Sequence, residues 1–129
     1  GTITIRAATP DDADALAAIG RDTFCETFAH LYAEEDLNTY LAQAYHAAAQ
    51  CEALHDPALL HLLAEQDGAL AGFTKSGPCA LPVDTGDERA YELCRLYVRE
   101  PWQGRGVAAL LMERVMAHAI SQHYDTLYI

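Results

Sequence analysis

The chain has little positive charge and no long apolar run. Only 8 of its 129 residues are Lys or Arg, whereas 19 are Asp or Glu, so the net charge is −11. Non-specific binding of nucleic acid requires a basic surface, and this composition argues against a nucleic-acid partner. No apolar run approaches the roughly 20 residues that a membrane-spanning helix needs, so we expect no membrane partner either.

Sequence patterns for disulfides, metal sites and secretion are also missing. The cysteines form no C-x-x-C pair and the histidines show no H-E-x-x-H spacing, so no metal site is predicted. The segment from Gly1 to Arg6 alternates like a strand, unlike a signal peptide. We therefore expect a cytoplasmic protein with four reduced thiols, at Cys25, Cys51, Cys79 and Cys94.

The bulk composition fits one globular domain. Hydrophobic residues make up 51% of the chain and charged residues 21%, a balance typical of globular proteins. A chain of 129 residues suits a single core. Because the sequence contains no repeat, low-complexity tract or linker, we expect one domain over residues 1–129.

Hydrophobic periodicity predicts one strand and two helices in the first part of the chain. Residues 2–8 alternate as a strand, and Thr9-Pro10-Asp11-Asp12 then supplies the cap, proline and acids typical of a helix start. A second helix is expected from Glu34, because apolar residues recur at helical spacing as far as Ala48. Asp56-Pro57 ends this helical region.

Three strands are predicted next. Residues 58–65 and 69–75 are typical of two strands, and Asp67-Gly68 between them is a strong hairpin signal. Residues 76–88 carry Gly, Pro and Asp without periodicity and are expected to form a loop. Residues 90–98 form the following strand.

The last predicted elements decide the fold class. A helix runs from Gln103 to about Gln122, and residues 124–129 begin another strand, so the order is β-α-α-β-β-β-α-β. A helix between two strands implies a parallel pair with a right-handed crossover. We expect an α/β domain with a mixed sheet, truncated at its C-terminus because the sequence stops inside a strand. The helix should bury Ala108, Leu111, Met112, Val115 and Ala119.

A glycine-spaced loop at the start of this helix is the most informative feature. Gly104 and Gly106 stand between the strand that ends at Val98 and the helix. A helix N-terminus has unpaired N–H groups and partial positive charge, and it can therefore hold a phosphate. Glycine lacks the side chain that would keep an anion away from the backbone. The loop predicts a phosphate-binding site.

The loop also fits the dinucleotide fingerprint G-x-G-x-x-A. Residues 99–103 separate Gly104 from the strand, whereas that fingerprint follows its strand almost directly. The acid that would bind the ribose should end the following strand, but Asp125 stands at its beginning. These two departures disfavour a dinucleotide, and an ordinary glycine-rich turn without a ligand is a further alternative.

A second way to divide the loop is Gln103-x-x-Gly106-x-Ala108, preceded by Leu96-Tyr97-Val98. This pattern resembles motif A of the GNAT family of N-acetyltransferases, and the resemblance extends from Tyr91 to Ile129 and to the order of elements before it. It implies the acyl-CoA N-acyltransferase fold, acetyl-CoA as cosubstrate, and a bulged strand that splays from the next one. The cofactor-binding residues that it implies are Leu96, Tyr97, Val98, Gln103, Gly104, Arg105, Gly106, Val107 and Ala108.

The resemblance also implies direct transfer of the acetyl group to an amine. The ammonium must first lose a proton, so a general base is needed. We expect Glu92 to be this catalytic base, because it has the same strand parity as Leu96 and Val98; an ordinary half-exposed glutamate is the alternative. The family's usual general acid, a Tyr on the helix after the last strand, would lie beyond Ile129.

The acceptor is predicted less directly. The segment from Thr23 to Phe28, with Tyr40 and Leu41, is similar to bacterial acetyltransferases of the spermine/spermidine type. Together with the net charge of −11, this similarity predicts a small amine, in particular a polyamine. A catalytically idle CoA-binding sensor or scaffold of the same fold is the alternative function. Because members of the family often form dimers, a homodimer is a further expectation.

Overall fold

The computed structural model contains a five-stranded mixed sheet in the spatial order β1-β2-β3-β4-β5. It describes residues 2–78 and 89–129. Neighbouring strands are antiparallel from β1 to β4, whereas β4 and β5 are parallel. The predicted mixed α/β class is therefore confirmed. The strands are β1 (Thr4–Ala7), β2 (Leu60–Gln66), β3 (Ala69–Pro78), β4 (Ala90–Val98) and β5 (Thr126–Tyr128).

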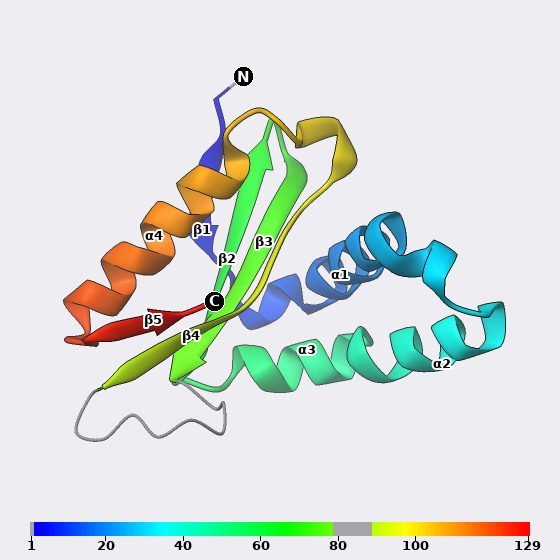
Figure 1. Ribbon diagram of the computed structural model, residues 1–129, viewed down its shortest axis with the longest axis horizontal. Coiled ribbons are helices and arrows are strands. Elements are labelled where there is room, and N and C mark those ends of the chain that lie inside the picture. Colours follow the sequence, from blue (N-terminus) through cyan, green and yellow to red (C-terminus); the bar gives the residue numbers. More distant parts are fainter. Residues whose placement is uncertain (1, 79–88) are drawn as a thin grey trace.

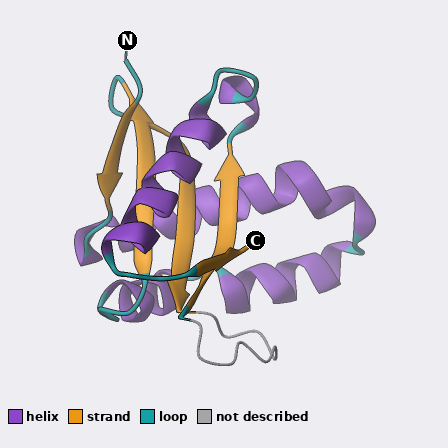
Figure 2. Ribbon diagram, turned by 60° about the vertical axis from the view of Figure 1, so that its left-hand side comes forward, coloured by secondary structure: helices purple, strands orange, loops and turns teal. Residues whose placement is uncertain are grey.

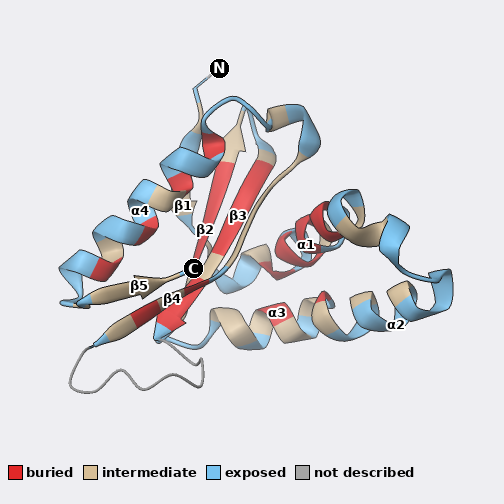
Figure 3. Cartoon of the chain, viewed as in Figure 1, coloured by how far each residue is buried: buried red, intermediate tan, exposed pale blue. Residues whose placement is uncertain are grey.

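Helices lie on both faces of this sheet. Helix α4 crosses one face, and α1 and α3 lie on the other (Figure 1, Figure 2). Helix α2 extends beyond the sheet and buries none of its residues (Figure 3). The helices are α1 (Ala13–Phe28), α2 (Glu34–Ala44), α3 (Ala47–Leu54) and α4 (Val107–Ser121).

Helix α4 buries one stripe against the sheet, but the stripe is shifted from the predicted one. Leu111, Val115 and Ala119 are buried as predicted, and Met112 is partly buried. Ala108 is exposed, and Val107 is buried in its place. The helix begins at Val107 instead of Gln103, because Gly104 and Gly106 have φ angles of 78° and 83°, which no α-helix accommodates.

The helical region after residue 34 contains two helices, whereas one was predicted. The chain leaves α2 at Tyr45, whose φ and ψ are −126° and 43°, and α3 begins after His46. The ring Nδ1 of His46 accepts a hydrogen bond from the Ala49 N–H at 3.2 Å and so caps α3. Tyr45 itself is only 2% exposed. The break turns this aromatic ring inward against α1.

The hairpin between β2 and β3 has the predicted turn. Asp67 and Gly68 have φ angles of 52° and 82°, as a turn of type I′ requires. Strand β3 continues to Pro78, so residues 76–78 are not part of a loop as predicted; the Ser76 hydroxyl is buried and lies 3.1 Å from the Tyr91 hydroxyl on β4. The remainder of the predicted loop, residues 79–88, lies outside the described residues.

A buried histidine lies on β2, on the face that α1 and α3 cover. His61 is 4% exposed, and its Nε2 has no hydrogen-bond partner in the described structure. Burial, together with the charges of Lys75 and Arg95, lowers its pKa from 6.5 to about 4. His61 is therefore neutral at pH 7.

Among the described residues, no helix has the length and apolar character that crossing a membrane requires.

Replacement of Gly20 by Ala should destabilise the fold. An added Cβ would lie 2.3 Å from Cδ1 of Tyr45, whose buried ring has little room to move. We expect a loss of about 1–3 kcal/mol in the free energy of unfolding, measured by urea titration. In an exposed helix the same change stabilises by up to about 1 kcal/mol, so an increase in stability would contradict the contact. Adding Tyr45→Leu should relieve the clash. The double variant should then lose less free energy of unfolding than the sum of the two single variants.

Acid should destabilise the protein through His61. Because its folded pKa is about 4 and its ordinary value 6.5, the unfolded chain binds the proton first. Stability should then fall as the pH drops from about 6.5 towards 4, by an amount of order 1–3 kcal/mol. Urea titrations across this range should show a flatter dependence for His61→Leu, with exposed His123→Leu as the matched control. Parallel pH curves for wild type and His61→Leu would exclude this role.

Candidate functional site

The parallel pairing of β4 with β5 covers the first three residues of β4. It includes only Ala90 with Thr126, Tyr91 with Leu127, and Glu92 with Tyr128. From Leu93 onward, no described strand pairs with this edge of β4. Because the sequence ends at Ile129, directly after β5, the splayed strand that the sequence resemblance implied stays a prediction.

The second half of β4 turns specific main-chain groups toward this open edge. The Arg99 N–H donates to the Ala71 carbonyl of β3 at 2.8 Å. Main-chain groups alternate between the two sides of a strand, so Leu96 and Val98 face away from β3. The Val98 carbonyl accordingly accepts a hydrogen bond from the Gln103 side chain at 3.1 Å. An extended ligand could pair with the edge at Leu96.

One extra residue, Cys94, produces a bulge in β4. Lys75 of β3 lies opposite Arg95, and the next residue, Ser76, lies opposite Leu93. A bulge of this kind changes which side chains face each side of the sheet. The bulge that the sequence resemblance implied is thus present, at Cys94.

Because of the bulge, Glu92 lies on the opposite face of the sheet from the one expected. Leu96 and Val98 pack on the α4 side of the sheet, together with Leu93. Glu92 lies opposite Gly77, on the other face, which it shares with Tyr97. The prediction that Glu92 shares a face with Leu96 and Val98 was wrong, because it assumed unbroken alternation across Cys94.

The glycine loop leaves room for a ligand at the N-terminus of α4. An added Cβ at Gly104 or Gly106 would have no atom within 4 Å. Helix α4 has 15 residues, and its N-cap Gly106 provides no side-chain cap, so the first N–H groups have no partner within the helix. This arrangement fits a phosphate. A hollow of about 270 Å³ adjoins the loop and is lined by Val98, Trp102, Gln103, Gly104, Gly106, Val107 and Ala108.

Most of the residues predicted to bind the cofactor therefore lie together. Six of them line the hollow, and Leu96 precedes it on β4. Arg105 is exposed at the rim of the loop, and Tyr97 packs on the opposite face against Phe73, with 5.7 Å between ring centroids. The main-chain groups of Tyr97 face β3, so Tyr97 is not among the residues that this arrangement brings together.

Several hydrogen bonds hold the loop before α4 in place. Besides the bond from Gln103 to Val98, Trp102 Nε1 donates to Gln66 Oε1 at 2.8 Å. Arg99 Nε donates to the Leu70 carbonyl at 3.1 Å, and its guanidinium pairs with Asp22 of α1 at 2.6 Å. These contacts hold the N-terminus of α4 beside the end of β4.

The face that carries Glu92 brings together groups that sequence reasoning did not connect. Lys75 and Arg95 face one another across β3 and β4, and His61 lies opposite Lys75 on β2. The Arg95 guanidinium lies 4.8 Å from the ring centroid of Tyr45. No local pattern could reveal this group, because its members come from four separate elements.

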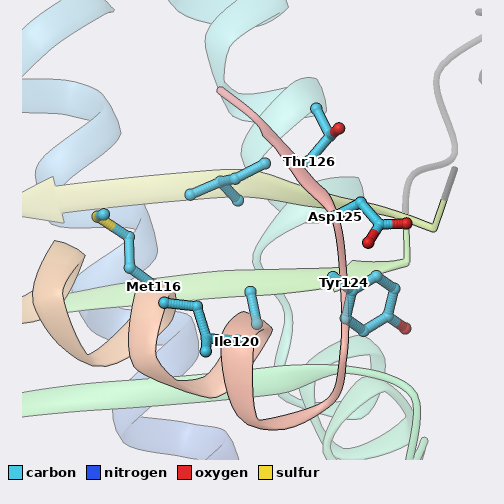
Figure 4. A pocket seen from close by; sticks show the side chains of 7 residues that line it. Met116, Ile120, Tyr124, Asp125 and Thr126 are labelled. Atoms are coloured by element: carbon cyan, nitrogen blue, oxygen red, sulfur yellow. The ribbon is translucent and has the colours of Figure 1, made fainter.

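A second hollow, of about 120 Å³, lies between α4 and β5 (Figure 4). Met116, Ile120 and Tyr124 contribute apolar surface to it. Asp125 is the acid that the sequence analysis compared with the ribose-binding residue of a dinucleotide site. It accepts a hydrogen bond from the Arg89 N–H at 3.1 Å. Asp125 lies at the opposite end of α4 from the glycine loop, which further disfavours a dinucleotide site.

Comparisons with known proteins agree with this geometry. The model of the "Acetyltransferase (GNAT) family" matches residues 25–129. An uncharacterised N-acetyltransferase of Mycobacterium tuberculosis is 33% identical over 108 residues, which are 84% of this chain and 65% of that protein. An uncharacterised N-acetyltransferase of Lactobacillus delbrueckii is 26% identical and is covered over 59% of its length. This chain thus spans less than two thirds of these relatives.

Solved structures share the fold. The PaiA N-acetyltransferase of Thermoplasma acidophilum, solved in complex with coenzyme A, has a TM-score of 0.82 and 21% identity; the match covers all of this chain and 80% of that one. An aminoglycoside acetyltransferase from a soil metagenomic sample has a TM-score of 0.74 and 17% identity, with the same coverage. Because the family model matches most of its length, this chain belongs to the acetyltransferase (GNAT) family.

Proposed function

We propose that this chain is an N-acetyltransferase domain, over residues 1–129, that transfers the acetyl group of acetyl-CoA to a primary amine of a small molecule. One observation carries the proposal: the open N-terminus of α4 lies beside the end of β4, where the main-chain groups of Leu96 and Val98 face away from β3. A phosphate-bearing thioester needs both features, because its pyrophosphate requires N–H donors and its extended arm requires a strand edge. The coenzyme A in the PaiA structure supports this assignment.

In this proposal, the loop and β4 divide the binding of acetyl-CoA between them. The N–H groups of Val107 and Ala108 donate to the pyrophosphate, and exposed Arg105 supplies a nearby positive charge. The main-chain groups of Leu96 pair with the pantetheine arm. Gln103 acts indirectly, since its side chain holds the loop to the Val98 carbonyl.

Helix α4 packs against Leu93, Leu96 and Val98 and so closes one face of β4. The acceptor amine therefore approaches from the other face, on which α1 and α3 lie. Glu92 lies on that face, opposite Gly77 of β3. We assign Glu92 as the general base that removes a proton from the ammonium, directly or through water.

The proposed reaction is a single displacement. The amine nitrogen attacks the thioester carbonyl, the carbon–sulfur bond breaks, and coenzyme A leaves as its thiolate, which takes up a proton. Glu92 receives the proton that the ammonium loses. N–H groups on the open edge of β4 can donate to the oxygen on which negative charge develops.

Two further expectations from the sequence stay predictions, namely the cytoplasmic location and the homodimer. The identity of the amine is also untested. The net charge of −11 by itself favours a polyamine. The cations Lys75 and Arg95, however, lie on the same face of the sheet as Glu92.

Gly106→Glu should abolish binding of acetyl-CoA. The new carboxylate would occupy the space next to the helix N-terminus and repel the pyrophosphate. We expect the Kd from isothermal titration calorimetry to rise at least about 100-fold. Gly68→Glu is a matched control, since Gly68 has a φ of 82° and equally open surroundings but lies in the β2–β3 turn. Equal affinity of the two variants would argue against the proposed cradle.

Glu92→Gln should slow the reaction without weakening the binding of acetyl-CoA. Loss of a general base lowers kcat by about 10²- to 10⁴-fold near neutral pH. The rate, followed by release of free thiol, should recover as the pH rises and more amine loses its proton in solution. Glu113→Gln, on the exposed side of α4, serves as the control. Unchanged kinetics would remove Glu92 from the mechanism, and binding without turnover of any amine by the wild type would indicate an idle CoA-binding domain.

A further inference from the structure

Two cations face one another beside Glu92. Lys75 and Arg95 are direct partners in the β3–β4 register, and both are half-buried. Like charges directly opposite one another destabilise a sheet. Within residues 2–78 and 89–129, neither has a carboxylate within ion-pair distance. Such a pair is unexpected in a chain with 19 acids and 8 Lys or Arg residues, so it calls for an explanation.

The surroundings of this pair are aromatic and neutral. The Arg95 guanidinium lies over the Tyr45 ring at 4.8 Å from its centroid, which orients the planar group. On the other side, His61 is buried and its Nε2 lacks a hydrogen-bond partner in the described structure. Burial lowers the pKa of His61, and both cations lower it further. This third basic group is therefore neutral at pH 7.

The same two cations lie close to the proposed reaction centre. Burial and then the charge of Glu92 raise the pKa of the Cys94 thiol at the bulge, and Lys75 and Arg95 act against this rise. Along β3, Lys75 and Gly77, the partner of Glu92, are two residues apart, which is roughly 7 Å. An amine at Glu92 and an anion at the cations can therefore belong to one small molecule.

We propose that Lys75 and Arg95 bind a carboxylate of the acceptor, so that the substrate is an amine that also carries a carboxylate, such as an amino acid. The inference rests on the proposed function and names its substrate class. Arginine binds a carboxylate through two parallel hydrogen bonds and lysine adds a point charge. A polyamine would instead bring its second ammonium next to two cations, so the earlier expectation of a polyamine acceptor gives way to this one.

Matched acceptor pairs test the proposal. Each pair consists of an amino acid and its decarboxylated amine: lysine with cadaverine, ornithine with putrescine, phenylalanine with phenethylamine, and tyrosine with tyramine; spermidine is added as a polyamine. Release of free thiol from acetyl-CoA gives kcat/KM for each compound. We expect at least one amino acid to exceed its amine by about tenfold or more. Equal values throughout, or preference for the amines or spermidine, would overturn the proposal.

Substitutions then test whether Lys75 and Arg95 cause the preference for an amino acid over its amine. In Lys75→Met/Arg95→Met the advantage of the amino acid should disappear, while the affinity for CoA stays as in the wild type. The single variants Lys75→Gln and Arg95→Gln should each lose part of the preference for the amino acid. If the double variant does not fold, these single variants test the assignment. Arg114→Met removes one positive charge from the exposed side of α4 and should keep the preference. A preference that survives in all the Lys75 and Arg95 variants would contradict the assignment.

Binding measurements separate this inference from the proposed enzyme activity. Saturation-transfer NMR on the same compounds, with and without CoA, reports acceptor binding even if no turnover occurs. Stronger signals for the amino acids, lost in the Lys75 and Arg95 variants, would support the carboxylate site whatever the catalytic outcome. Signals that do not distinguish the members of any pair would overturn it, even if Glu92→Gln and Gly106→Glu behave as expected.

Discussion

The extra residue at Cys94 is the constraint on which the rest of the site depends. Without it, strict alternation would turn Glu92 to the same face as Leu96, against α4. The bulge keeps Leu96 and Val98 packed against α4 while Glu92 and Arg95 face the other layer. One inserted residue thus places the cofactor edge and the acceptor face on opposite sides of a single strand.

The loop after β4 determines how the end of this strand and the N-terminus of α4 lie relative to one another. Here Arg99 and Trp102 fasten the loop to β3 and β2, which places the N-terminus of α4 beside the end of β4. Strand donors and helix donors then point into the same region. An extended ligand that ends in phosphates matches both, whereas a free phosphate would use only the second.

Local features were predictable from the sequence, and features that depend on distant partners were not. The Asp67-Gly68 turn and the limits of β4 follow from residue types at short range, and both were confirmed. The break at Tyr45 depends on a glycine 25 positions earlier in the chain, Gly20, which makes room for the ring. The bulge at Cys94 depends on the register with β3, which periodicity within β4 does not report. For the same reason, the glycine loop was found from sequence and the pair of cations was not.

The net charge of the chain and the local charge beside Glu92 favour different acceptors. Which charge matters more depends on its distance from the bound acceptor. The net charge of −11 describes the whole surface, and salt screens such charges beyond about 8–10 Å. It can steer cations toward the protein, but it does not determine what binds next to Glu92. Half-buried charges are screened less, so Lys75 and Arg95 act on a ligand bound at Glu92 more strongly than distant surface charges do. An acceptor with an ammonium group and a carboxylate a few atoms away is compatible with both charges. The protein as a whole attracts the ammonium, and the pair Lys75 and Arg95 binds the carboxylate.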